Sequence, residues 1–453
     1  MMNSAALLTF PKGGVHPPES KELTSGIPIE EMPVPANLEI ILGQHIGVPC
    51  EPLVKKHSKV QEGELIGQVS RGLGVPIHAP ISGTVANIGD SYHPFRVSTP
   101  SVTIRSSTDS EPVCYTPVDW NAFSREELKD KVRAAGIIGA GGAGFPTHVK
   151  LSPPPDARID TLILNGAECE PYLTADHRIM VEHAEEVIIG AQVILKILGI
   201  KRCLIGIEAN KPDAIATMTD AARKQSRDAA NRGEQVEIAV KTLQVKYPQG
   251  SEKQLIQSLT GRKVPGFGLP LAIGVVVQNI TTARAIYEAA VLNKPFIEKV
   301  VTISGRGIKR PANLNVKVGT LVSDIVNYLG GTTEDLKKVV LGGPMMGFAV
   351  STLDIPILKT TSSILFLTKD EIDIRPHSNC IRCGWCVEVC PMGLQPCEIG
   401  MYVEAGKGKD TRQFGALECF ECGSCAYVCP AKRPLVQFVR LAKMELNKKP
   451  LVV

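Results

Sequence analysis

The sequence has few aromatic residues, little excess charge and no long apolar run. Aromatic residues make up 5% of the 453 positions, and the formal net charge is +4, so neither base stacking nor net charge predicts nucleic-acid binding. The most apolar stretch, Val187 to Ile200, contains Gln192 and Lys196 and is shorter than the ~20 residues of a membrane-spanning helix. The apolar residues 5–8 are too few for a secretory signal. Any membrane association is therefore expected to be peripheral.

The first quarter of the chain is rich in glycine, proline and short apolar alternations. The stretches 60–68 and 77–85 predict short β-strands closed by glycines. They resemble the two half-motifs of a biotinyl/lipoyl barrel-sandwich domain. A carrier domain of that kind needs a lysine between the halves, and none occurs from Val69 to Pro80. We therefore expect a non-carrier barrel-sandwich-like β domain over 1–115.

Residues 116–298 change to alternating helices and strands. Ser124 and Glu127 form a capping box that opens one helix, and a long helix is expected from Thr174 to Leu198. Short apolar strands are expected at four places: 158–164, 203–207, 236–240 and 271–277. This alternation predicts parallel βαβ units, that is, a Rossmann-like α/β domain.

Short strands return over 299–353, around one helix at 322–329, and suggest a small β-grasp module. Residues 354–375 are interpreted as a connector. Nine of the 13 cysteines lie between Cys380 and Cys429, within a domain expected over 370–440. The predicted fold class is therefore a multidomain chain that combines α+β and α/β modules.

Two cysteine runs share the spacing C-x2-C-x2-C-x3-C-P, one from Cys380 to Pro391 and one from Cys419 to Pro430. In this ferredoxin pattern, three cysteines bind one [4Fe–4S] cluster and the fourth binds the other cluster. We therefore predict a two-cluster ferredoxin-like domain with two ligand sets: Cys380, Cys383, Cys386 and Cys429 for the first cluster, and Cys419, Cys422, Cys425 and Cys390 for the second.

Structural zinc is the alternative for these cysteines, although zinc sites usually use separated cysteine pairs. A secreted disulfide framework is not indicated, because no signal segment is recognised. Cys397 stands outside both runs and is interpreted as a buried structural thiol. The clusters would carry one electron at a time, and the spacing predicts neither their potentials nor the direction of transfer.

A glycine-rich loop runs from residue 139 to residue 147. Its four glycines, Gly139, Gly141, Gly142 and Gly144, would let backbone amides approach a phosphate without a steric clash. The spacing fits neither the dinucleotide-binding G-x-G-x-x-G pattern nor a Walker loop. A phosphate site and a plain tight turn both stay open at this point.

Three polar motifs lie at predicted strand ends or helix starts: 165–171, 250–252 and 278–279. Ligands of parallel α/β sheets bind at the carboxyl ends of the strands. Each motif alone could be a helix cap or a turn. Their occurrence together favours a ligand site.

These motifs resemble a known family. The glycine loop with Lys150, the run 165–171, Tyr247-x-x-Gly250-x-Glu252 and the pair 278–279 look like motifs of the NADH- and FMN-binding subunit of respiratory complex I. Set after a barrel-sandwich domain and before β-grasp and two-cluster ferredoxin modules, they resemble the C subunits of Rnf electron-transport complexes. Residues 12–18 and 44–47 also match that family.

The resemblance implies an NADH-dependent oxidoreductase subunit of an ion-translocating electron-transport complex, peripheral at the cytoplasmic face of the inner membrane through its partner subunits. It implies FMN, NAD(H) and two [4Fe–4S] clusters, since a flavin can exchange both hydride and single electrons. It also implies a set of cofactor-binding residues. The four loop glycines with Lys150, Asn165 and Asn279 would contact FMN, and Phe145, Glu168 and Glu170 would lie on the nicotinamide side. Glu252 is a further cofactor-binding residue that is assigned to neither side.

Three positions depart from the complex I pattern: Ala140, Ala167 and Ser251 replace an Arg, an Asp and a Glu. They keep open a non-enzymatic electron-wire scaffold without a nucleotide site. A soluble cobalamin reductase is another alternative, but its α/β domain lies near the N-terminus, whereas about 115 residues precede it here.

Basic residues gather near the end of the chain: Lys432, Arg433, Arg440, Lys443, Lys448 and Lys449. They are consistent with a solvated helix face or with docking to acidic membrane subunits or lipid.

Overall fold

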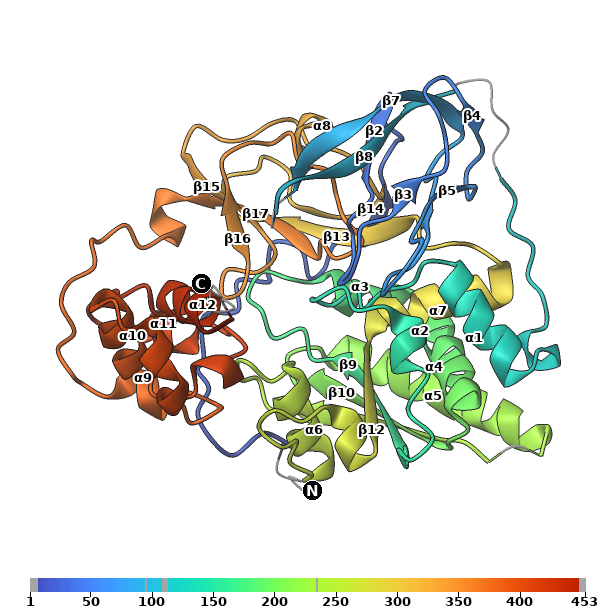
Figure 1. The fold of residues 1–453 in the computed structure, drawn as a ribbon. Helices are drawn as coiled ribbons and strands as arrows, with labels where there is room; N and C mark the ends of the chain where they lie inside the picture. The colour runs from blue at the N-terminus through green and yellow to red at the C-terminus, as the bar shows by residue number, and fades with distance from the viewer. Residues whose placement is uncertain (1–6, 94–95, 108–112, 234, 448–453) are drawn as a thin grey trace, which may run out of the picture.

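The computed structural model describes residues 7–93, 96–107, 113–233 and 235–447. A barrel-sandwich β domain, an α/β domain, a β-grasp module and a cysteine-rich helical domain pack together (Figure 1). The fold class predicted from the sequence is therefore confirmed. No helix among these residues is long and apolar enough to cross a membrane.

Two antiparallel sheets form the barrel-sandwich domain, drawn in blue in Figure 1. The strands are β2 (Asn37–Ile41), β8 (Arg96–Ser106), β7 (Gly83–His93) and β4 (Lys59–Val60) in one sheet, and β3 (Glu51–Pro52), β5 (Leu65–Gln68) and β6 (Ile77–His78) in the other. Alternate residues of a strand point to the same face, so Leu38 and Ile40 of β2 pack with Val102 and Ile104 of β8 in the core.

The α/β domain is built on a four-stranded parallel sheet in the order β11-β10-β9-β12. Its strands are β9 (Thr161–Gly166), β10 (Arg202–Glu208), β11 (Glu237–Leu243) and β12 (Val275–Asn279). Its helices are α1 (Arg125–Ala134), α2 (Thr147–Lys150), α3 (Ala175–Glu182), α4 (Ala184–Leu198), α5 (Pro212–Asn231), α6 (Glu252–Thr260) and α7 (Ile280–Leu292). Side chains of α6 pack on one face of the sheet, and those of α4, α5 and α7 pack on the other.

The single long helix predicted from Thr174 to Leu198 is wrong, because α3 and α4 are separate helices. His183 interrupts them with φ −128° and ψ 30°, and its Nδ1 atom lies 3.1 Å from Glu186 Oε1 in the next turn. The predicted strand at 271–277 begins later, at Val275. Pro270 opens a short 3-10 turn there, and Gly274 ends that turn in a left-handed conformation.

The β-grasp module is a six-stranded sheet in the order β1-β14-β13-β17-β15-β16. Its elements are β1 (Ile29–Glu31), β13 (Glu298–Ser304), β14 (Ala312–Lys317), α8 (Val322–Tyr328), β15 (Leu336–Leu341), β16 (Phe348–Val350) and β17 (Ser363–Thr368). The connector expected over 354–375 is wrong at β17, which pairs with both β13 and β15 inside the sheet. Every residue of β17 is buried, as its apolar run 364–367 requires.

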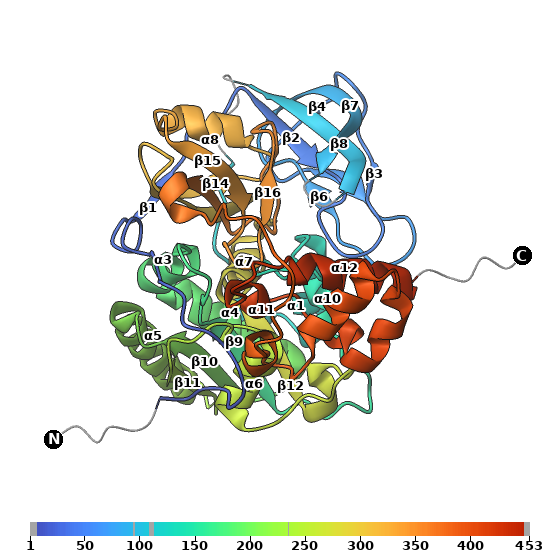
Figure 2. The same cartoon turned by 90° about the vertical axis from the view of Figure 1, so that its left-hand side faces the viewer.

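The cysteine-rich domain contains α9 (Trp385–Glu388), α10 (Pro396–Glu404), α11 (Ser424–Tyr427) and α12 (Leu435–Asn447). The N-terminal segment connects it to the α/β domain, as Figure 2 shows. Gly14 N–H donates to Val389 O (2.9 Å), and Val15 N–H donates to Tyr247 O (2.8 Å). The same segment then reaches the β-grasp sheet as β1, so it holds several domains together.

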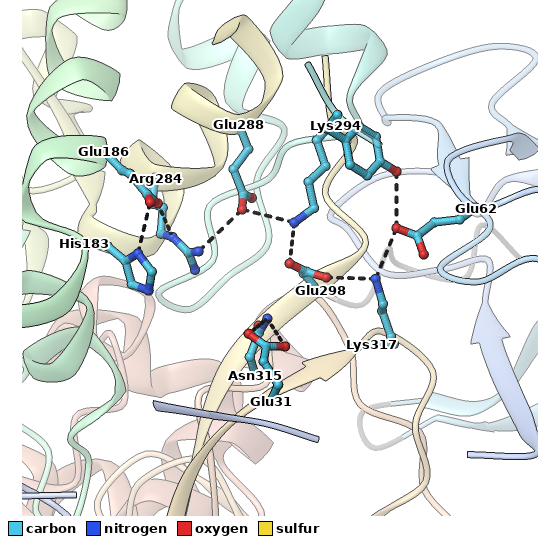
Figure 3. Close-up of polar contacts among 11 residues, drawn as sticks. Glu31, Glu62, His183, Glu186, Arg284, Glu288, Lys294, Glu298, Asn315 and Lys317 are labelled. Atoms are coloured by element: carbon cyan, nitrogen blue, oxygen red, sulfur yellow. Dashed lines mark hydrogen bonds and ion pairs between the residues drawn. The ribbon is translucent and has the colours of Figure 1, made fainter. Parts of the chain in front are cut away.

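A chain of alternating charges crosses the domain boundaries, as Figure 3 shows. It starts at Arg284 of α7, passes through Glu288 and Lys294 to Glu298 of β13, and continues through Lys317 to Glu62 of the barrel-sandwich domain. Most of these side chains are largely shielded from water. The interaction is therefore less screened than a surface ion pair and fixes the relative position of three domains.

Replacing Glu298 by glutamine should destabilise the protein at neutral pH by about 3 kcal/mol. Burial alone would raise the pKa of Glu298, but the ammonium groups of Lys294 and Lys317 lower it to about 2. The carboxylate therefore contributes stability above its ordinary pKa of 4.5, and this contribution is lost as the pH falls towards 2. Urea unfolding midpoints of the wild type and the Glu298→Gln variant, taken at pH 7 and pH 4, measure the loss of stability. The gap between the two midpoints should be smaller at pH 4.

Asp220→Asn is the control for this substitution, because the Asp220–Arg223 pair is exposed and its atoms are 3.5 Å apart. It should leave the urea midpoint nearly unchanged. An equal effect of both substitutions would contradict the assignment of interdomain stability to Glu298.

Candidate functional site

The glycine loop joins α1 to α2 and is closed by its own backbone. Gly139 N–H donates to Phe145 O (2.9 Å), and Ala140 N–H donates to Thr282 Oγ1 (3.0 Å). The next four amides, those of residues 141–144, have no hydrogen-bond acceptor among the described residues. Gly144 adopts a left-handed φ of 66°, which glycine tolerates. Consecutive free amides can form a concavity that binds a phosphate.

The loop lies at the switch point of the parallel sheet. From β9 the chain adds β10 and β11 on one side and then returns to add β12 on the other side. The carboxyl ends of β9 and β12 therefore border the crevice where α/β sheets bind ligands. Asn165 and Asn279 are register partners at these ends. A Cβ atom on Gly141 would lie 2.9 Å from Asn279 Cγ, so the loop meets this edge.

Asn279 is held by two hydrogen bonds. Its Oδ1 atom accepts from Thr281 N–H (2.8 Å) and caps α7, and its Nδ2 atom donates to Asp176 Oδ2 (2.7 Å). Thr281 Oγ1 donates to the other oxygen of Asp176 (2.8 Å). Burial, and then the nearby Glu168, raise the pKa of Asp176 to about 6. Asp176 was not among the predicted site residues, since it occupies an ordinary first-turn position of α3.

The structure also brings Lys150 and Glu252 together, although 102 positions separate them. Lys150 Nζ lies 3.0 Å from Glu252 Oε1 and donates to Val277 O of β12 (3.3 Å). Asn165 Nδ2 donates to Gly250 O (2.8 Å), so the 250–252 motif lies against the end of β9. The predicted cofactor-binding residues on α2, α6, β9 and β12 therefore converge at one edge of the sheet.

Glu168 has its carboxylate at the start of α3. It accepts from the backbone N–H groups of Asp176 (2.7 Å) and His177 (3.2 Å), and its own φ is 46°. Lys21 of the N-terminal segment donates to the backbone oxygen of Glu168 (3.0 Å). In this arrangement the carboxylate acts as a helix cap.

Glu170 is a second partly buried carboxylate with backbone partners. It accepts from Met345 N–H (3.1 Å) and Met346 N–H (2.9 Å) of the β-grasp module. Burial raises its pKa to about 7, although these amides and Lys21 oppose the shift. Glu170 therefore joins the α/β domain to the β-grasp module beside the crevice and titrates near neutral pH.

Two buried polar atoms near the crevice have no hydrogen-bond partner among the described residues. They are Thr147 Oγ1, in the last residue of the glycine loop, and Gln278 Nε2, next to Asn279. Buried polar groups are normally satisfied, so a polar molecule at this edge would provide a reason for them. Ala140 and Ala167, which depart from the complex I pattern, are both fully buried. Larger polar residues would not fit there without a shift.

The predicted ligands of the first cluster line one pocket: Cys380, Cys383, Cys386 and Cys429. Cys397 lines the same pocket and hydrogen-bonds to Cys386, so it lies closer to these cysteines than its sequence position suggested. Arg382 N–H donates to Cys380 Sγ (3.4 Å) from a left-handed conformation with φ 55°. Amide donors of this kind stabilise thiolates and tune cluster potentials.

The second predicted set is also grouped in space. Burial raises the pKa of Cys419 to about 11, with further contributions from the neighbouring Cys422 and Cys390 thiols. Cys390 likewise contributes to the raised pKa of Cys425. Glu421 N–H donates to Cys419 Sγ (3.3 Å). Cysteines of the two runs are therefore neighbours in both sets, which is the cross-run grouping predicted for two [4Fe–4S] clusters. Within the described ranges, no group of three or more His, Cys, Asp or Glu side chains is placed to hold a metal ion.

The two sets differ in their surroundings. Tyr247 is buried and its hydroxyl donates to Cys422 O (2.7 Å), so the second set lies against the α/β domain. The first set is near the surface, where Cys383 is exposed beside Ile381 (66% exposed) and Trp385 (51% exposed).

Four of the predicted basic residues near the end of the chain are in ion pairs. Arg440 and Lys443 both contact Glu421, at 2.8 and 2.7 Å. Lys432 pairs with Asp373 (2.8 Å), and Arg433 pairs with Glu404. These contacts give the four cations a role inside the chain, and Lys448 and Lys449 lie outside the described residues.

Four family models match the chain. They are the Nuo51 FMN-binding domain over 132–288, the RnfC barrel sandwich hybrid domain over 8–109, the SLBB domain over 300–349 and the 4Fe-4S dicluster domain over 379–432. The α/β domain is therefore an FMN-binding domain, and the cysteine-rich domain belongs to the iron–sulfur dicluster type.

Curated relatives match nearly the whole chain. It is 45% identical over 437 residues to the C subunit of the proton-translocating ferredoxin:NAD(+) oxidoreductase complex of Clostridium ljungdahlii, with 96% of this chain and 93% of the relative covered. It is 41% identical to the C subunit of the Na(+)-translocating ferredoxin:NAD(+) oxidoreductase complex of Acetobacterium woodii, with 96% of each chain covered. The C subunit of the ion-translocating oxidoreductase complex of Rhodobacter capsulatus is 42% identical to this chain, and the match covers 97% of this chain and 83% of the relative.

Among solved structures, a chain of the NAD+-reducing [NiFe]-hydrogenase in the H2-reduced state has a TM-score of 0.51 and 17% identity. The match covers 73% of this chain and 61% of that chain, so this protein spans less than two thirds of it. The likeness concerns the fold alone.

Proposed function

Because this chain belongs to the family of C subunits of ion-translocating ferredoxin:NAD(+) oxidoreductase complexes, we propose that it transfers electrons between NAD(H) and the other subunits of such a complex. The observation that carries the proposal is the row of four free amides at the switch point of the sheet, beside Asn165 and Asn279. A non-enzymatic scaffold would have no use for such a site.

FMN would be held at this edge of the sheet. The amides of residues 141–144 would receive its phosphate, and Lys150, Asn165, Glu252 and Asn279 would line the crevice beside it. FMN, when bound, supplies the chemistry that accepts a hydride and releases single electrons. Oxidation of NADH yields NAD+, one proton and two electrons, so the electrons leave in two separate steps.

The nicotinamide side of the site would include Phe145, Glu168 and Glu170. Glu168 would act indirectly in this proposal, since its carboxylate caps α3 and so fixes Asp176 behind Asn279. Glu170 titrates near neutral pH and lies beside the crevice, where it could hold the proton that NADH oxidation releases.

The clusters would act in a fixed order. The Cys419 set lies against the α/β domain through Tyr247 and would exchange electrons with the flavin. The Cys380 set, at the surface beside Ile381 and Trp385, would exchange electrons with a partner subunit. We further propose that the protein is held at the cytoplasmic face of the inner membrane by its partner subunits.

Anaerobic purification tests the proposal directly. We expect about eight iron atoms per chain, four for each cluster, together with one FMN. The FMN- and cluster-replete protein should reduce an artificial acceptor with NADH. A fully loaded sample without this activity would argue for the electron-wire alternative, and reduction of cob(III)alamin without recovery of membrane partners would favour a cobalamin reductase.

A further inference from the structure

A buried lysine lies directly behind the glycine loop. Lys299 of β13 is 4% exposed, and its ammonium group donates to Ala140 O (2.7 Å) and to Lys359 O (3.0 Å). Burying an ammonium group is costly unless another charge compensates for it. Among the described residues, no carboxylate forms a direct ion pair with Lys299. Asp176 influences it from farther away, but its oxygens bond to Asn279 and Thr281.

Two other shielded lysines near this module have a visible structural reason. Lys294 contacts Glu288 (3.3 Å) and also Glu298. Lys359 is 2% exposed and donates to Gly136 O (2.7 Å), just after the end of α1, where the helix dipole favours a cation. Lys299 has neither a carboxylate nor a helix end as its direct partner.

The contact with Ala140 sets the direction of the loop amides. A peptide group is planar and trans, so its C=O and the following N–H point in opposite directions. When Lys299 holds the oxygen of Ala140 behind the loop, the N–H of Gly141 must point to the other side. The N–H of Gly141 is the first of the four free amides. The ammonium group is then separated from the concavity by one peptide group.

We propose that Lys299 is a positioning residue for the phosphate of FMN, orienting the amide of Gly141 and placing a positive charge behind the loop. This inference rests on the proposed function, in which the loop binds that phosphate. The anion would supply the compensating charge that Lys299 lacks. Burial lowers the pKa of Lys299 to about 7, against the opposing effect of Asp176, so its charge responds readily to a nearby anion.

Comparison of FMN with riboflavin tests the proposal, because riboflavin lacks only the phosphate. The measurement is the ratio of the riboflavin Kd to the FMN Kd, from fluorescence titrations of the flavin-free, cluster-containing protein. In Lys299→Met the ratio should fall by about tenfold, the size expected for one charge-assisted contact. Riboflavin affinity should stay near that of the wild type. Inorganic phosphate should compete with FMN less effectively in this variant.

Lys359→Met is the matched control, since it removes an equally buried lysine of the same module. It should lower the melting temperature, because the backbone oxygen of Gly136 after α1 loses its lysine partner. It should change the ratio of the riboflavin Kd to the FMN Kd less than Lys299→Met does. Lys299→Gln can still donate to Ala140 O, so it should restore part of the ratio and is a second variant if the Met form folds poorly.

The outcomes separate this inference from the proposed function. An unchanged ratio in a Lys299 variant that binds riboflavin normally would overturn the role of Lys299, while FMN binding itself would stand. Equal losses of both flavins in the Met and Gln forms would also overturn it and indicate a purely structural lysine. Absence of FMN binding in the wild type would instead overturn the proposed function.

Discussion

Replacing Gly141 by alanine should remove most of the FMN from the purified protein and weaken its rebinding by about tenfold or more. The added Cβ atom would lie 2.9 Å from both Cγ and Nδ2 of Asn279. Asn279 cannot yield easily, because it caps α7 and donates to Asp176. The loop must therefore move outward, and its free amides would shift away from the edge formed by Asn165 and Asn279. Fluorescence titration of the flavin-free protein measures the change.

Gly139→Ala is the matched control in the same loop. A Cβ atom there would lie no closer than 3.7 Å to a neighbouring atom, at Phe145 O, which is an ordinary contact. We expect near wild-type FMN affinity and an unchanged melting temperature. Wild-type affinity in Gly141→Ala, or an equal loss in both variants, would contradict the placement of the phosphate on residues 141–144.

The parts of the site that follow from short-range spacing could be predicted from the sequence. The glycine loop needs its glycines within a few positions, and Asn165 and Asn279 directly end apolar strands. Parallel strands bring such ends to one edge, so their convergence follows from the βαβ pattern. Each cysteine run has the ferredoxin spacing, in which the fourth cysteine binds the cluster of the other run. The spacing alone therefore predicts the cross-run grouping.

Other features depend on contacts between distant segments, which spacing does not reveal. Lys299 appears in the sequence as the polar start of an apolar strand, and only the packing of β13 behind the loop gives it a partner. β17 was interpreted as part of a connector although its run 364–367 is apolar, because no neighbouring signal indicated a further strand of the β-grasp sheet after residue 353. The break at His183 was missed because both flanking helices continue the same apolar periodicity.

Replacing Cys422 by serine should stop NADH from reducing the cluster that remains, whereas the equivalent Cys383→Ser should not. Both residues are the second cysteine of their run, so each variant should lose one cluster and about four iron atoms. The Cys422 set lies against the α/β domain, and its loss removes the nearer acceptor and leaves only the cluster at the surface. Because electron transfer slows steeply with distance, that surface cluster should stay oxidised.

Electron paramagnetic resonance of the anaerobic variants distinguishes the two cases, with dithionite as a reductant that reaches clusters without the flavin. In Cys383→Ser, NADH and dithionite should give the same cluster signal. In Cys422→Ser, only dithionite should give one. The backbone oxygen that accepts from Tyr247 is retained in the serine form, so the difference reports on the cluster rather than on that contact. The reverse pattern would place the Cys380 set next to the flavin and would require the order of electron transfer to be inverted.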